Sequence, residues 1–292
     1  MKKTAFPLIL ASLATASAVS AEGVNYLSYG ASYSNVSFDG ASFNAFGAGA
    51  STDYQSGNLV FNGGVSFTKL SDDTDSFELT AVDARVGYFV MPQLAVYAGL
   101  SYFDVSDFDS LTTYNLGAEY SMNGATVGLN YDDSEEDGYV ATTTVYGSYR
   151  VGESVEAMAA ISDTDGYRST TIGVDYDNGA YDLAAMANFT DDANLFALDA
   201  KYAFGNGFRV SGNYINFDDG MDMSSIGAGY EVSPDLWVDL NVGRLNGTGA
   251  GSVELVGLAL TYEMGSETML VDRATKTQVD ALGPLGQIVM AF

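Results

Sequence analysis

The sequence of 292 residues contains neither cysteine nor histidine. Without cysteine there are no disulfides, thiolate metal sites or thiol nucleophiles, and without histidine there is no His-dependent catalytic triad or His-based zinc site. Basic residues are scarce: 11 Lys and Arg stand against 38 Asp and Glu, a formal charge of −27 that argues against a nucleic-acid partner. Beyond the N-terminal segment, no apolar run approaches the 18 residues of a transmembrane helix.

The residues that are abundant indicate a folded chain. There are 33 Gly, 20 Tyr and 16 Phe but only four Pro. Disordered acidic chains have few aromatic residues, because they lack the apolar surface to form a core. The sequence is therefore that of an acidic, aromatic and glycine-rich protein with a defined fold.

The N-terminal segment has the features of a secretory signal peptide. Lys2 and Lys3 precede an apolar stretch over residues 5–14, and the small residues Val19-Ser20-Ala21 end it before Glu22. This predicts cleavage after Ala21, with residues 1–21 as a removed signal and an exported mature chain.

The mature chain alternates apolar and polar residues with a period of two. Residues 196–204 place Phe196, Leu198 and Tyr202 on one face and Asp199 and Lys201 on the other. Such alternation is typical of a strand with one apolar and one wet face, and no helical stripe occurs in this part of the chain. About sixteen strands are predicted, over residues 24–33, 41–52, 57–68, 77–90, 93–104, 110–121, 124–132, 139–151, 153–162, 168–177, 179–189, 194–204, 206–217, 223–232, 235–245 and 252–263.

The connections between these strands alternate in chemistry. The odd-numbered ones are acidic, as in the densest group, Asp132, Asp133, Glu135, Glu136 and Asp137. The even-numbered ones carry tight-turn sequences such as Asn123-Gly124 and Asn178-Gly179. Because alternate connections of an up-and-down sheet lie on one side, one end of the fold is expected to be rich in carboxylates and the other to be closed by short turns.

The apolar faces favour a membrane-spanning barrel over a secreted soluble β-protein. A tilted spanning strand needs about 9–11 residues, which matches the predicted lengths. Aromatic residues adjoin the short turns, where an interfacial girdle would lie: Tyr88, Tyr120, Tyr149, Tyr176, Tyr181, Phe204 and Phe208. Closing the sheet removes its unpaired edges, as a bilayer demands. The predicted fold is therefore an all-β, closed antiparallel transmembrane barrel of about sixteen strands over residues 22–263.

The sequence resembles the Gram-negative general porins, particularly those of the alphaproteobacterial type. The resemblance rests on the signal ending Val19-Ser20-Ala21, the mature start Glu22-Gly23-Val24, the alternating strands and the terminal Phe292. It implies an outer-membrane porin, often a homotrimer, that contacts lipid and lipopolysaccharide and lets small hydrophilic solutes and ions diffuse passively. It also implies that the acidic loops face outward and the tight turns face the periplasm.

The sequence departs from that family in two places. General porins narrow their barrel with a long third loop, whereas the third acidic connection here, residues 104–110, is too short for that role. In addition, residues 264–292 follow the predicted last strand. Three readings of this C-terminal tail stay open: a periplasmic extension, a plug, or part of the closing strand.

Strand parity predicts which charged residues line the lumen. Acidic residues outnumber basic ones among them, which predicts a cation preference. The predicted pore-lining residues are Asp83, Arg85, Glu119, Arg150, Asp175, Asp182, Asp199, Lys201, Arg209, Glu231 and Asp239, and Glu156 shares their parity.

Catalysis is not expected, and neither a cofactor nor a specific metal site is predicted. No histidine is present to act as a general base, no EF-hand spacing occurs, and strand parity brings no carboxylate pair together. The acidic loops either stay solvated or loosely bind divalent cations that bridge to lipopolysaccharide. The alternative to a porin is a non-conducting structural or adhesive outer-membrane barrel, which the short loops disfavour.

Overall fold

A computed structural model describes residues 23–38, 41–72, 76–106, 108, 110–134, 136, 138–191, 193–218, 220–247 and 251–274. The predicted signal peptide and residues 275–292 lie outside these, as do parts of the acidic connections. The strands are β1 Val24–Phe38, β2 Ala41–Ser56, β3 Leu59–Ser71, β4 Ser76–Met91, β5 Leu94–Val105, β6 Leu111–Met122, β7 Ala125–Ser134, β8 Thr142–Val151, β9 Val155–Thr164, β10 Tyr167–Asp177, β11 Tyr181–Thr190, β12 Asn194–Ala203, β13 Phe208–Phe217, β14 Met221–Ser233, β15 Leu236–Gly247 and β16 Gly251–Gly265.

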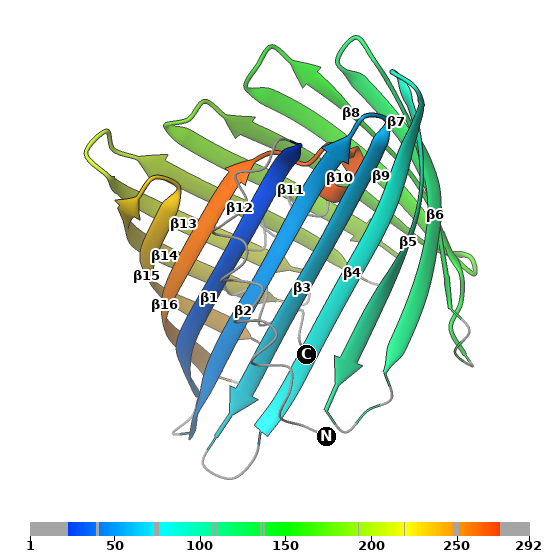
Figure 1. The fold of residues 1–292 in the computed structure, drawn as a ribbon. Coiled ribbons are helices and arrows are strands. Elements are labelled where there is room, and N and C mark those ends of the chain that lie inside the picture. Colours follow the sequence, from blue (N-terminus) through cyan, green and yellow to red (C-terminus); the bar gives the residue numbers. More distant parts are fainter. Residues whose placement is uncertain are drawn as a thin grey trace.

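The sixteen strands form one closed antiparallel barrel, which confirms the predicted fold class (Figure 1). Each strand pairs with its neighbours in sequence, and the ring closes where β1 pairs with β16, from Tyr26 opposite Gly265 to Phe38 opposite Val253. In Figure 1 the dark-blue β1 and the orange β16 run side by side. The described residues therefore leave no open sheet edge.

The predicted and observed strands agree closely, and the largest difference is at the first hairpin. β1 continues to Phe38 and β2 to Ser56, beyond the predicted residues 33 and 52. Ser34, Asn35 and Ser37 interrupt the apolar alternation, yet all three pair with both neighbouring strands. Backbone hydrogen bonding continues there after the outer face has stopped being apolar.

Local sequence chemistry sets the short turns. Asn123 and Gly124, between β6 and β7, both have positive φ, 53° and 81°. These are the signs that a type I′ hairpin turn requires, and its twist matches that of the flanking strands. The predicted Asn-Gly turn therefore fixes the register of this hairpin.

The outer face of the barrel is apolar and exposed. Leu116, Val127, Ile226 and Leu258 are 53–67% exposed and point away from the lumen. Near the short turns the same face carries aromatic pairs, such as Tyr181 and Tyr202, whose ring centroids lie 4.6 Å apart. Of the predicted girdle, all members are exposed except Tyr176, which is partly buried. Among the described residues, no helix is long and apolar enough to cross a membrane.

After β16 the described part of the chain continues inside the barrel. Residues 266–274, which we call the inner segment, turn into the lumen at the short-turn end and include one helical turn over residues 270–274 (Figure 1, orange-red). Met269 and Leu270 are each 1% exposed. The first part of the C-terminal tail is therefore a packed element of the barrel interior.

Candidate functional site: the barrel interior

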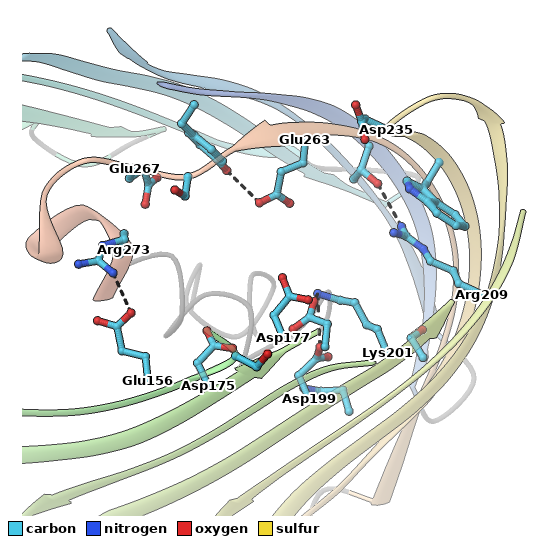
Figure 2. Close-up of a pocket in the computed structure, with 18 of the residues that line it drawn as sticks. Glu156, Asp175, Asp177, Asp199, Lys201, Arg209, Asp235, Glu263, Glu267 and Arg273 are labelled. Atoms are coloured by element: carbon cyan, nitrogen blue, oxygen red, sulfur yellow. Dashed lines mark hydrogen bonds and ion pairs between the residues drawn. The ribbon is translucent and has the colours of Figure 1, made fainter. Parts of the chain in front are cut away.

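A cavity of about 650 Å³ opens inside the barrel beside the inner segment (Figure 2). Its wall comes from β8 to β16 together with Tyr26 of β1, and the inner segment contributes Ser266, Glu267 and Arg273. Residues of β2 to β7 do not line it. The cavity therefore occupies one side of the lumen only.

Lys201 is held between two carboxylates on the cavity wall. Its Nζ lies 3.3 Å from Asp182 of β11 and 3.4 Å from Asp199 on its own strand. Asp199 sits two residues along the same face, and Asp182 is the direct cross-strand neighbour of Lys201. Because side chains alternate between the two faces of each strand, all three charged groups point to the inner face and form this cluster.

Arg209 forms the second charged contact on this wall. Its Nε donates to Asp239 Oδ1 at 2.7 Å, and Nη2 donates to Oδ2, so the pair is bidentate. The guanidinium also lies 4.2 Å from the ring centre of Trp237. A planar guanidinium suits both partners at once, which fixes its orientation toward the cavity.

Glu156 joins the barrel wall to the inner segment. Its Oε2 accepts from Arg150 and from Arg273, each at 2.7 Å, and Ser148 donates to Oε1 at 2.6 Å. Figure 2 shows Arg273 reaching from the inner segment to Glu156. One carboxylate on β9 is thereby shared by two guanidinium groups.

Glu119 holds the start of the helical turn. The backbone N–H groups of Leu270 and Val271 donate to its two oxygens at 2.9 and 2.7 Å. Tyr146 also donates to Glu119, at 2.8 Å, and its hydroxyl contacts that of Tyr97 at 2.8 Å. A carboxylate at the N-terminus of a helical turn satisfies N–H groups that lack partners within the helix.

Asp53 anchors the other end of the inner segment. It is fully buried and accepts from the Thr268 backbone N–H at 3.1 Å and from the Thr268 hydroxyl at 2.9 Å. Asn25 donates to both residues, at 3.1 Å to Asp53 and 2.9 Å to Thr268. This ties β1, β2 and the inner segment together.

All eleven predicted pore-lining residues lie on the inner face, and the structure divides them into three groups. Arg85 pairs with Asp272 of the inner segment, Glu119 caps its helical turn, and Asp83 shares the parity of Arg85 on β4. Glu231 accepts from the Asp235 N–H at the β14–β15 turn. The other seven line the cavity: Arg150, Asp175, Asp182, Asp199, Lys201, Arg209 and Asp239.

Sequence reasoning missed an apolar cluster on the inner face. Its core comprises Ile215, Met223, Leu255 and their neighbours, all at most 7% exposed, at the end of the barrel that carries the long connections. The signal was present in the sequence: Ile215 and Phe217 have the parity of Asn213, so the inner face of β13 changes from polar to apolar at the end of the strand. On this side of the barrel the inner face is therefore apolar at the end with the long connections.

The electrostatics of the cavity are acidic. Ten Asp and Glu line it against four Lys and Arg.

Outside the strands, the pKa of Tyr139, in the connection between β7 and β8, is raised mainly by burial and also by the nearby charges of Asp132 and Asp133. In the part of the chain that is described, no group of three acidic residues has the geometry to hold a metal ion.

The structure is similar to those of several outer-membrane proteins of Pseudomonas aeruginosa. OccK3 (OpdO) matches with a TM-score of 0.54 at 13% identity, covering 83% of this chain and 96% of that one. OpdQ matches with a TM-score of 0.56 at 9% identity, covering 84% and 99%, and OpdK bound to vanillate with 0.52 at 14%, covering 83% and 98%. No family model and no curated protein sequence matches this chain. At these identities the likeness is one of fold.

Proposed function

We propose that this chain is an outer-membrane channel through which small hydrophilic solutes and ions diffuse passively. The observation that carries the proposal is an inverted distribution of polarity: aliphatic side chains face out around a closed sheet, and charged side chains face a cavity within it. Soluble proteins rarely expose apolar patches beyond a few hundred Å². A bilayer is the surrounding that suits such an outer face, and water suits such an interior.

The remaining features fit the outer membrane. The exposed aromatics near the short turns suit the level where lipid meets water. The proposed signal peptide over residues 1–21 would direct export, and outer-membrane lipid and lipopolysaccharide would surround the barrel. The fold likeness to outer-membrane proteins of Pseudomonas aeruginosa supports this location. Homotrimer formation and membership of the general porins stay predictions.

We also propose that the channel prefers cations. The acidic excess in the cavity lining and the carboxylates in the connections at the opposite mouth both give the path a negative potential. Such a potential raises the local concentration of cations and lowers that of anions. Small hydrophilic solutes with a positive group are then favoured over anionic ones of the same size.

The test is single-channel recording of the refolded mature chain in a planar bilayer under a salt gradient. Ohmic steps with a reversal potential on the cation side are expected, and a heat-unfolded sample of the same preparation serves as the control. A reversal potential on the anion side would overturn the cation preference alone. A folded barrel that never conducts would overturn the channel proposal. It would favour the non-conducting structural barrel, an alternative that the presence of the inner segment inside the lumen also favours.

A further inference from the structure

We propose that the inner segment, residues 266–274, is the constriction of this channel, and that solutes pass through the cavity between it and the β8–β16 wall. The inference rests on the proposed channel function and assigns the part of the chain that sets pore width. The third acidic connection, residues 104–110, is too short to narrow the barrel, and the inner segment would do so in its place.

The first argument is the position of the inner segment in the cross-section. Most of its contacts are with one side of the barrel: Thr268 with Asp53 of β2, Met269 with Ala95 and Tyr97 of β5, and Leu270 with Glu119 of β6. Arg273 alone among these reaches the cavity wall, at Glu156 of β9. The cavity is lined by the other side, β8 to β16. The segment therefore covers the β2–β6 wall and leaves open the half of the lumen in front of it.

The second argument is how firmly the segment is attached. Four ionic side chains of the wall hold it, namely Asp53, Arg85, Glu119 and Glu156, and they come from β2, β4, β6 and β9. Asp53 and Glu119 are 0% and 5% exposed, so water does not compete for these hydrogen bonds. Attachment across this arc of the barrel makes the segment a fixed rim of the aperture.

The third argument is the charge that the segment brings to the aperture. It presents Ser266, Glu267 and Arg273 to the cavity, opposite a wall that carries Lys201 and Arg209. Figure 2 shows Glu267 and Arg273 on one side of the cavity, with Lys201 and Arg209 across it. A solute in this gap would pass between charges from both sides, so the segment would influence selectivity as well as size.

The absence of cysteine allows a direct test on the full chain. Ser266→Cys places one thiol on the cavity side of the segment, at an exposed residue, with almost no change in volume. Reaction with a positively charged methanethiosulfonate reagent should reduce single-channel conductance by roughly half or more and move the reversal potential toward anions. Gly205→Cys, in an open short turn at the same end of the barrel, is the matched control and should show neither change.

A second arm releases the segment instead of blocking beside it. The double variant Asp53→Asn with Glu119→Gln removes both buried anchor charges and should raise conductance roughly twofold or more. Glu254→Gln removes an exposed carboxylate from the outer face of β16, on the side that carries Val256 and Leu258, and should leave conductance near that of the parent. Heat-modifiable migration on a gel checks that each barrel has folded. If the double variant does not fold, the Ser266→Cys experiment alone tests the inference.

The outcomes separate this inference from the channel proposal. If the parent conducts and neither full thiol modification nor release alters its conductance relative to the controls, the constriction is elsewhere and only this inference fails. If the parent is silent and the release variant conducts, the segment plugs the barrel, which overturns both the passage of solutes beside it and the proposal of an open channel. If the parent and the folded release variant are both silent, the channel proposal and this inference fall together.

Discussion

Charged side chains of the barrel pair across strands, and the consequence differs with burial. Arg209 and Asp239 have side chains only 20% and 10% exposed, whereas Arg168 and Asp163, near the acidic mouth, are 65% and 43% exposed. Exposed ion pairs contribute little because water and salt screen them. When a largely buried carboxylate loses its partner, it still bears the free-energy cost of desolvation, and the protein is destabilised.

We therefore expect Arg209→Ala to lower the free energy of unfolding in urea by about 1–3 kcal/mol, because Asp239 is left without its bidentate donor. The same change should move the reversal potential further toward cations, since it removes a positive charge from the cavity. Arg168→Ala is the control and should change stability by less than about 1 kcal/mol. Equal losses in the two variants would contradict the importance of the Arg209 pair.

At the scale of the hairpin, backbone conformation specifies the register. Gly124 has a φ of 81°, and a Cβ there would lie 3.3 Å from the Arg150 carbonyl oxygen. Gly205 sits in another short turn with open space around it and no positive φ. The two glycines thus have different requirements although both lie at the same end of the barrel.

Gly124→Ala should cost about 1–2 kcal/mol of unfolding free energy, because an alanine disfavours the left-handed conformation. Gly205→Ala should be close to neutral or slightly stabilising. Urea titrations of the two variants in the same lipid vesicles provide the comparison. A neutral Gly124→Ala would mean that the turn can adopt another conformation without loss of register.

The strands and the inner segment show how much of the structure could be predicted from the sequence. Alternation located all sixteen strands because every one has an apolar outer face, and Asn-Gly turns marked the short connections. It could not place residues 266–274, because Met269 and Leu270 are buried by contacts with Tyr97 and Glu119, which lie more than 150 residues away in the chain. Parity assigned Glu119 to the lumen but could not reveal that it binds backbone N–H groups.

For the whole molecule, the decisive property is the solvent around the barrel. Leu258 lies in the middle of β16, opposite Leu240 and Tyr33, and is 53% exposed on the outer face. In a bilayer Leu258→Arg should cost about 2–4 kcal/mol, the cost of a cation near the midplane. In water the same substitution at an exposed position would cost almost nothing.

Val140→Arg is the matched control, because Val140 is 42% exposed but lies in the connection between β7 and β8. Folding yields and unfolding free energies of both variants in vesicles give the measurement. A loss confined to Leu258→Arg is expected. Equal and small effects would mean that the outer face does not contact lipid.

The seam between β1 and β16 has a consequence for the order of assembly. It joins residues more than 200 positions apart, so the ring stays open until the final strand has been synthesised and exported. Until then two edges with unpaired backbone groups persist, and such edges can pair with other chains. Residues 266–274 follow the seam and lie inside the ring, so the pairing of β16 with β1 and the enclosure of these residues take place together, and a chain that lacks β16 achieves neither.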